Sequence, residues 1–257
     1  MLKVENLCAS YNGKKVFENV SFSLNQNSIT ALCGLNGSGK STLLSLMSGI
    51  CFPSLKISGK VLLDGKNILK QSPKITAKQI SYLVQDEHSA WNINVEKLVD
   101  GGRFVHRKWY EESNQLDKKI ITKSLCSVSL EDYEKRFIST LSGGEYQRAR
   151  LARSFAQQTP YIFLDEPLAA IDVIHQKNIL QMLKEFCETE DKTICISIHD
   201  INLAAQFADY IILMKENRSG IIFGHPDEII NEDSLFQTYG KKFQLFKHPI
   251  TKKIQIW

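Results

Sequence analysis

The sequence of 257 residues has no long apolar run and only a small excess of one charge. Its 32 basic and 28 acidic residues leave a net charge of +4, too small to indicate a nucleic-acid partner. The longest apolar stretches, such as Tyr210–Met214, are far too short to cross a bilayer. We expect no signal segment, because Lys3 and Glu5 interrupt the start. Any membrane-embedded part is therefore expected to come from another chain.

The six cysteines contain no C-x-x-C pair. Since most of them lie in apolar runs, we expect core thiols in a reducing compartment rather than a disulfide framework. With 43% hydrophobic content, the chain is long enough to bury a full core. The composition therefore predicts one compact unit with a lobe or subdomain.

Short apolar runs alternate with helical patterns, which predicts an α/β fold. The first two strands are expected at residues 2–7 and 16–24, with Asn12-Gly13 as the turn between them. Further strands are expected at residues 28–33, 59–64, 80–84, 161–164 and 193–198, and helices at 43–47 and 173–188.

Two regions depart from this alternation. Residues 86–139 mix polar, charged and aromatic side chains at helical spacing, which predicts a mostly helical lobe. The tail, residues 209–257, is expected to hold short strands around Gly220, Gly224 and Gly240, and two short helical pieces.

Residues 34–42, Gly-Leu-Asn-Gly-Ser-Gly-Lys-Ser-Thr, satisfy the phosphate-loop pattern G-x-x-x-x-G-K-[ST] between a predicted strand and a predicted helix. The glycines allow backbone N–H groups to close around phosphate oxygens, and the helix N-terminus adds its positive dipole end. A glycine-rich turn with a chance lysine is the alternative, which this context disfavours. Lys40 would reach the β- and γ-phosphates, and Ser41 would ligate Mg²⁺. The candidate nucleotide-binding residues of the loop are Gly34, Asn36, Gly37, Ser38, Gly39, Lys40, Ser41 and Thr42.

Residues 161–167, Tyr-Ile-Phe-Leu-Asp-Glu-Pro, run from four apolar residues into two adjacent acids. This pattern predicts a buried strand whose C-terminal end meets a ligand, as in other open α/β sheets. Asp165 would hold Mg²⁺ directly or through water. Glu166, one residue farther, would polarise a water for in-line attack. An acidic turn after a strand is common on its own, but less expected downstream of a phosphate loop.

Residues 141–148, Leu-Ser-Gly-Gly-Glu-Tyr-Gln-Arg, predict a capped helix start. Ser142 with Glu145 three residues later is a capping box. The double glycine Gly143-Gly144 leaves backbone N–H groups bare, which makes a second anion site. Because this site lies about a hundred residues from the first, the two sites suggest an ATP bridged between two copies of the chain.

Together these motifs resemble the ATP-binding-cassette (ABC) ATPases over essentially the whole chain. Residues 34–42 look like the Walker A motif, 161–166 like Walker B, and 141–147 like the signature motif. The resemblance implies a P-loop NTPase core, a mixed sheet with flanking helices, joined to an antiparallel β subdomain and a helical signature-motif subdomain. It implies a single domain, with residues 1–85 and 140–257 as the RecA-like core, β subdomain and tail, and 86–139 as the helical subdomain.

The resemblance also gives roles to residues that mean little alone. Gln85 looks like the Q-loop glutamine, which contacts Mg²⁺ or the attacking water, and His199 looks like the switch histidine. Tyr11 looks like the aromatic residue that stacks on adenine, although it could simply pack at a hairpin. Asp172 ends Ala-Ala-Ile-Asp, a D-loop in which isoleucine replaces the usual leucine.

An ABC resemblance implies a head-to-tail dimer that hydrolyses ATP with Mg²⁺. Each ATP would lie between the Lys40 loop of one copy and Ser142–Glu145 of the other. Glu166, His199 and Gln85 would be catalytic, and the metal ligands would be Ser41, Gln85 and Asp165. The helical lobe would couple this cycle to separate permease chains at the cytoplasmic face of the membrane, served indirectly by a substrate-binding protein.

Residues 197–209, Gly102-Arg103 and the tail from 239 to 251 resemble the importer branch for iron–siderophore, haem and cobalamin uptake. This likeness implies an iron-bearing chelate as cargo. Cobalamin, manganese and zinc stay open, because the ATPase does not touch its cargo. A soluble, non-transport ABC ATPase also stays open. A chromosome-associated member would carry a long coiled coil before Ser142, where no sustained heptad occurs, and a translation factor would carry two cassettes.

Overall fold

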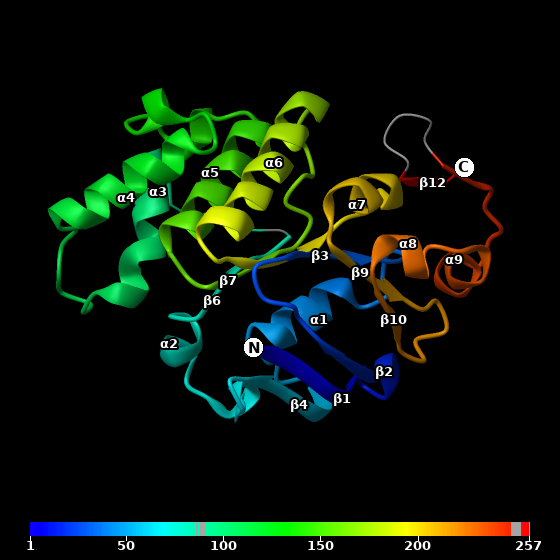
Figure 1. The fold of residues 1–257 in the computed structure, drawn as a ribbon. Helices are drawn as coiled ribbons and strands as arrows, with labels where there is room; N and C mark the ends of the chain where they lie inside the picture. The colour runs from blue at the N-terminus through cyan, green and yellow to red at the C-terminus, as the bar shows by residue number, and fades with distance from the viewer. Residues whose placement is uncertain (86, 88–90, 248–252, 257) are drawn as a thin grey trace.

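The computed structural model describes residues 1–85, 87, 91–247 and 253–256, and two sheets organise them (Figure 1). The larger sheet has the strand order β10-β9-β3-β8-β7-β6. Five of its strands are parallel, and β10 pairs with β9 in the antiparallel sense. The bounds are β3 Ile29–Cys33, β6 Ile80–Leu83, β7 Tyr161–Leu164, β8 Thr193–Ser197, β9 Tyr210–Met214 and β10 Ile221–Gly224.

The smaller sheet is antiparallel, with the order β2-β1-β4-β5. Its strands are β1 Leu2–Tyr11, β2 Lys14–Ser23, β4 Leu55–Leu63 and β5 Lys66–Asn67. Helix α1, Lys40–Met47, lies between the two sheets (Figure 1). Its leucines and Met47 are fully buried in one cluster with residues of both sheets. The β subdomain thus closes over the helix that follows the phosphate loop.

The strands of the larger sheet are apolar on both faces. Along β3, Ile29, Ala31 and Cys33 pack with the helices α6 (Val173–Thr189) and α7 (Ile201–Phe207), whereas Leu32 joins the α1 cluster. Successive strand residues point to opposite faces, so a sheet covered on both sides requires continuous apolar runs. This requirement explains the runs that predicted the strands.

The predicted lobe range holds α3 (Val95–Asp100), the 3₁₀ segment η2 (Gly101–His106), α4 (Gln115–Cys126), η3 (Glu131–Tyr133) and η4 (Ile138–Thr140). Helix α5, Gly143–Ala156, packs on both α3 and α4 and also reaches β6. It therefore joins the lobe to the sheet. The division of the chain at 85/86 and 139/140 stays a prediction.

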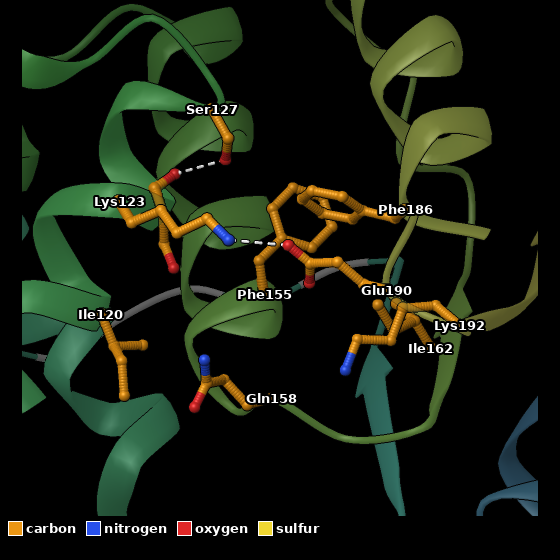
Figure 2. A pocket seen from close by; sticks show the side chains of 10 residues that line it. Ile120, Lys123, Ser127, Phe155, Gln158, Ile162, Phe186, Glu190 and Lys192 are labelled. Carbon is orange, nitrogen blue, oxygen red and sulfur yellow. Dashed lines mark hydrogen bonds and ion pairs between the residues drawn. The ribbon is translucent and has the colours of Figure 1, made fainter. Parts of the chain in front are cut away.

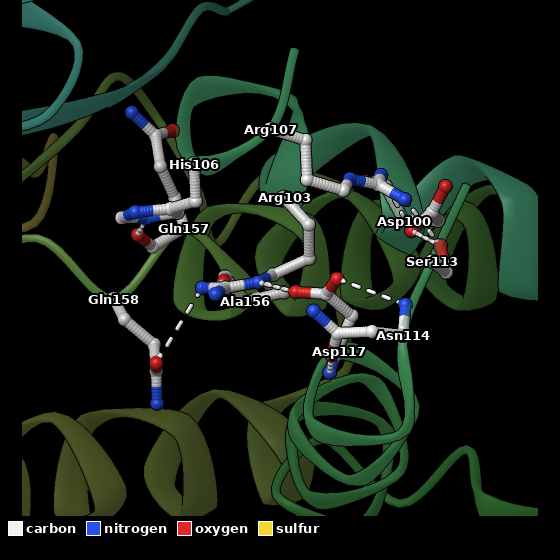
Figure 3. Close-up of polar contacts among 10 residues, drawn as sticks. All are labelled: Asp100, Arg103, His106, Arg107, Ser113, Asn114, Asp117, Ala156, Gln157 and Gln158. Carbon is white, nitrogen blue, oxygen red and sulfur yellow. Dashed lines mark hydrogen bonds and ion pairs between the residues drawn. The ribbon is translucent and has the colours of Figure 1, made fainter. Parts of the chain in front are cut away.

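A buried polar cluster holds the lobe together (Figure 3). Arg103 Nε donates to Asp117 Oδ1 at 2.8 Å, and Nη1 donates to the Ala156 carbonyl at 2.9 Å. A Cβ on Gly102 would lie 2.2 Å from the Arg153 carbonyl oxygen, so only glycine allows η2 to approach α5 this closely. Gly102 and Arg103, which the sequence marked only by likeness, thus have structural roles.

The structure differs from the sequence-based expectations at one glycine of the tail, at two short helices and at the cysteines. Gly240 does not lie in a strand: it ends α9 (Glu232–Tyr239) with a φ of 68°, the left-handed conformation that glycine favours. Helices α7 and α2 (Pro73–Thr76) were not expected. Only Cys33, Cys187 and Cys195 are buried, while Cys51 and Cys126 are exposed. The remaining elements are η1 Ile68–Lys70, α8 Pro226–Ile229, β11 Leu245–Lys247 and β12 Ile254–Ile256.

Part of the tail likeness, residues 248–251, lies outside the described residues. Within the ranges that are described, none of the helices has both the length and the apolar character of a membrane span.

Candidate nucleotide site

Ten of the predicted residues meet at one cleft of about 540 Å³, hereafter the nucleotide cleft. They come from the end of β1, the phosphate loop, and the ends of β6, β7 and β8. The lining residues are Tyr11, Val16, Asn36, Gly37, Gly39, Lys40, Ser41, Thr42, Gln85, Glu166 and His199. Val16 was not predicted. Gly34, Ser38 and Asp165 are buried beneath this lining.

The phosphate loop requires its glycines. Gly39 has a φ of +102°, and a Cβ there would lie 2.7 Å from Val16 Cγ1. Gly34 has a φ of +153°, and its Cβ would lie 2.9 Å from Met214 Cβ. Gly39 is also the N-cap of α1 and makes no side-chain cap. The first N–H groups of α1 are therefore left for a ligand.

Lys40 is 5% exposed, and its Nζ donates to the carbonyls of Gly34 at 2.9 Å and Leu35 at 3.1 Å. Burial lowers the pKa of this amine, while the carboxylates of Glu166 and Asp165 act in the opposite direction. The ammonium is thus held across the loop by two backbone carbonyls.

Glu166 lies at the centre of the predicted catalytic residues. Gln85 Nε2 donates to its Oε2 at 2.9 Å, and His199 Nε2 lies 2.7 Å from its Oε1. Its φ of 49° falls in the left-handed region, where non-glycine residues are uncommon. Backbone strain of this kind is found at functional sites, where surrounding contacts impose it. The structure therefore brings Gln85, Glu166 and His199 together as the sequence predicted.

Asp165 is oriented by Ser197, a residue that the sequence analysis missed. Ser197 Oγ donates to Asp165 Oδ1 at 2.8 Å and accepts from the Glu166 N–H at 2.7 Å. In the sequence, Ser197 is marked only by its hydroxyl at the end of a mostly apolar strand. Asp165 is 1% exposed, and its Oδ2 accepts no hydrogen bond from the described residues. A buried carboxylate oxygen without a donor is suited to a cation.

Tyr82 lies between Asp165 and the loop. Its hydroxyl donates to the Ser41 carbonyl at 3.5 Å, a long hydrogen bond. Burial, and then the charge of Asp165, raise the pKa of this phenol above its usual range. Tyr82 is thus a neutral hydroxyl that contacts the Ser41 backbone and feels the charge of Asp165.

The predicted capping box at Ser142 is confirmed. Ser142 Oγ accepts from the Glu145 N–H at 3.3 Å, and Glu145 Oε2 accepts from the Ser142 N–H at 2.7 Å. The Tyr133 hydroxyl donates to the other oxygen of Glu145 at 2.8 Å. A Cβ on Gly144 would lie 3.1 Å from the Ala170 carbonyl, so α5 begins against the predicted D-loop.

Ser142, Gly143, Gly144 and Glu145 do not line the nucleotide cleft of their own chain. Neither does Asp172, which is the N-cap of α6: its Oδ1 accepts from the N–H groups of Ile174 and His175 at 3.0 Å each. Within one chain, these five predicted residues therefore stand apart from Lys40.

Two other cavities lie on the helical side of the molecule. A cavity between α4, α5 and α6, where Lys123 Nζ donates to Glu190 Oε1 at 2.7 Å, holds only about 30 Å³ (Figure 2). It has room for about one water and is no ligand site. A larger cleft of about 500 Å³, hereafter the lobe cleft, opens between the lobe and the end of β6. It is lined by residues that include Tyr82, Glu87, Phe104, Arg153 and Gln157.

Comparison with known proteins gives a consistent result. Residues 17–169 match the ABC transporter family. The chain is 38% identical to the petrobactin import ATP-binding protein YclP of Bacillus subtilis, covering 93% of this chain and 92% of that protein. It is 36% identical to the iron(3+)-hydroxamate import ATP-binding protein FhuC of the same organism, with 98% and 92% covered.

Among solved structures, a metal-chelate type ABC transporter in an inward-facing conformation matches with a TM-score of 0.82 and 26% identity. The match covers 100% of this chain and 97% of the chain in that structure. Sequence and fold therefore agree on one family.

Proposed function

This chain belongs to the ABC transporter family of ATPases, and we propose that it powers the import of an iron–siderophore or related metal chelate. Two relatives are ATP-binding proteins for petrobactin import and for iron(3+)-hydroxamate import, and a structural neighbour is a metal-chelate type ABC transporter. Coverage of more than nine-tenths of each relative supports carrying their task over to this chain.

The chemistry follows from the nucleotide cleft. Lys40 and the first N–H groups of α1 would stabilise the charge that develops on the γ-phosphate. Glu166 would polarise the attacking water, and His199, 2.7 Å from Glu166, would hold the γ-phosphate beside it. Before this happens, the carboxylate must exchange its present partners, Gln85 and His199, for water and substrate.

Ser41, Gln85 and Asp165 would hold Mg²⁺, and the free Oδ2 of Asp165 fits that role. The ion would neutralise charge on the β- and γ-phosphates. Tyr11 would stack on the adenine from the end of β1. These assignments make the cleft a complete site for the phosphates, except on the face that opens to solvent.

A second copy of the chain would close that face. Ser142–Glu145 form a helix start that does not reach the nucleotide cleft of its own chain. A head-to-tail pair would place the N–H groups of Gly143 and Gly144 over the γ-phosphate of the partner, with Asp172 at the contact. ATP binding would close this dimer and hydrolysis would open it.

The lobe cleft would receive a permease helix. It lies next to Gln85 in the chain, through Glu87, and it exposes the apolar ring of Phe104. The protein would then work at the cytoplasmic face of the membrane, with a substrate-binding protein contributing only indirectly. Residues 86–139 would form the subdomain that carries most of this docking surface.

The proposal is tested in two steps. Purified wild-type protein should hydrolyse Mg-ATP, and Glu166→Gln should lower turnover by about 10²–10⁴ while ATP still binds. Cells that carry Lys40→Ala in place of the wild type should fail to grow on ferric siderophore as the sole iron source, and free ferrous iron should restore growth. Normal growth on chelate with a defect in another nutrient would refute the cargo and leave the ATPase intact.

A further inference from the structure

We propose that Arg150 is a positioning residue for catalysis: its buried guanidinium holds the two backbone segments that carry Gln85 and Glu166. The inference rests on the roles proposed above for those two residues. Arg150 lies on α5, outside every motif that the sequence analysis assigned to ATP, and it does not line the nucleotide cleft. Any effect on hydrolysis must therefore act through other residues.

The first segment is the chain that leaves β6. Arg150 Nη2 donates to the Val84 carbonyl at 2.5 Å, and Nη1 donates to the Gln85 carbonyl at 3.2 Å. Arg150 is 3% exposed, so both carbonyls are satisfied by a donor that water cannot easily replace. The backbone of Gln85 is therefore fixed from behind, and its amide is aimed at Glu166, 2.9 Å away.

The second segment is the chain that follows β7. Arg150 Nη1 also donates to Gln147 Oε1 at 2.7 Å, and Gln147 Nε2 donates to the Pro167 carbonyl at 3.2 Å. Pro167 directly follows Glu166, whose backbone has the strained φ of 49°. Through one amide, the same guanidinium thus stabilises the turn that presents the catalytic carboxylate.

Glu87 anchors the arginine from the other side. One oxygen of its carboxylate lies 3.5 Å from Arg150 Nε. The two oxygens also accept hydrogen bonds from Nη1 and Nη2 of Arg153, at 2.6 and 2.5 Å. The charge and hydrogen bonds of Arg153, and then those of Arg150, keep the pKa of Glu87 below its usual range. Glu87 and Arg153 line the lobe cleft, so the anchor faces the proposed permease site.

Arg153 provides a matched comparison, since it lies one helical turn from Arg150 on the same helix and shares Glu87. Among the described residues, the side-chain hydrogen bonds of Arg153 go to Glu87 alone. Arg150 also contacts the Gln85 segment directly and the Glu166 segment through Gln147. A purely structural role predicts similar effects for the two arginines. A positioning role predicts that only Arg150 changes the chemical step.

The test compares Arg150→Gln with Arg153→Gln in Mg-ATP hydrolysis by the full chain. Misplacing a catalytic group by about 1 Å can cost roughly 10²-fold in rate, so Arg150→Gln should lower kcat by about 10- to 100-fold. Its KM for ATP should stay within about twofold, because the phosphate loop is untouched. Arg153→Gln should lower kcat by less than about threefold.

If Arg150→Gln fails to fold, Arg150→Lys keeps a buried cation that can reach one carbonyl. Its kcat should then lie below that of Arg153→Gln, with a KM for ATP within about twofold of the wild type. Equal losses in both arginine variants, or a rise in KM that accounts for the lost activity, would overturn the positioning role. Failure of the growth test leaves this result unaffected, because the assay needs no permease and no chelate.

Discussion

Two helices of the molecule begin at glycine-rich turns that were predicted to bind phosphate, and their first N–H groups are capped differently. Helix α1 begins at Gly39, which offers no side-chain cap and no acid in the first turn. Helix α5 begins at Ser142, where Ser142 and Glu145 cap each other. The first helix start is left open, while the second is partly satisfied within its own chain.

The difference indicates how the two starts can be used. Around α1, the buried cation of Lys40 and three glycine positions with positive φ make a concave cradle of the kind that binds compact anions. Around α5, the capping box keeps the helix end ordered without a ligand. An ordered, partly satisfied helix start suits a surface that meets nucleotide only when a second copy brings one.

The largest effect is expected at the open start. Replacing Lys40 by Ala should lower turnover by about 10²–10³, the usual cost of removing one donor from developing charge. ATP binding should weaken with it, because Lys40 is the buried cation of the loop. Steady-state kinetics and titration with a fluorescent nucleotide measure both quantities.

Lys60→Ala, which removes an exposed lysine from β4, is the control for a simple loss of charge. Turnover close to that of the wild type in Lys40→Ala would mean that the loop does not bind the reacting phosphate.

The next effect is expected at the capped start. Ser142→Arg, in a Glu166→Gln background that traps ATP, should weaken the ATP-dependent dimer by at least about tenfold, through steric and charge conflict. Each monomer should still bind ATP, because Ser142 does not line the nucleotide cleft of its own chain. Size-exclusion chromatography with light scattering measures the dimer, and Ser54→Arg, at another exposed serine, is its control.

An unchanged dimer in Ser142→Arg would refute the proposed arrangement of two copies around ATP. A loss of ATP binding by the monomer would show instead that α5 acts within one chain, and the contrast between the two helix starts would disappear.

The sequence predicted those features whose residues lie close together in the chain, and it missed those that depend on distant residues. The capping box is a three-residue spacing, and the phosphate loop is nine consecutive residues, so both could be identified from the chain alone. Ser197 and Arg150 act on residues about 30 and 65 positions away. Their partners are set by strand order and helix packing, which no local pattern contains.

The wrong expectation at Gly240 has the same cause. A glycine can interrupt a strand or end a helix. Gly240 ends a helix because α9 packs its Leu235 into the core. The strands of the larger sheet were easier, because burial on both faces leaves a continuous apolar run in the sequence.

The smallest effect concerns the charge that distinguishes the capped start. The N–H of Ser142, then the Tyr133 hydroxyl, lower the pKa of Glu145 from 4.5 to about 2 in the folded protein. A depressed carboxyl pKa contributes stability above pH 4.5, and this contribution is lost as the pH falls from 4.5 towards 2. Glu145→Gln can still complete a capping box, so the substitution removes the charge and keeps the cap.

Urea unfolding of the wild type and Glu145→Gln, at several pH values between 7 and 3, measures this contribution. The wild type should have the higher urea midpoint at pH 7, and the difference should shrink steadily below pH 4.5. A difference in urea midpoint that stays constant with pH would mean that the charge of Glu145 does not contribute to the stability of α5. The α1 start, which has no acid in its first turn, would then differ from the α5 start in its cap but not in its electrostatics.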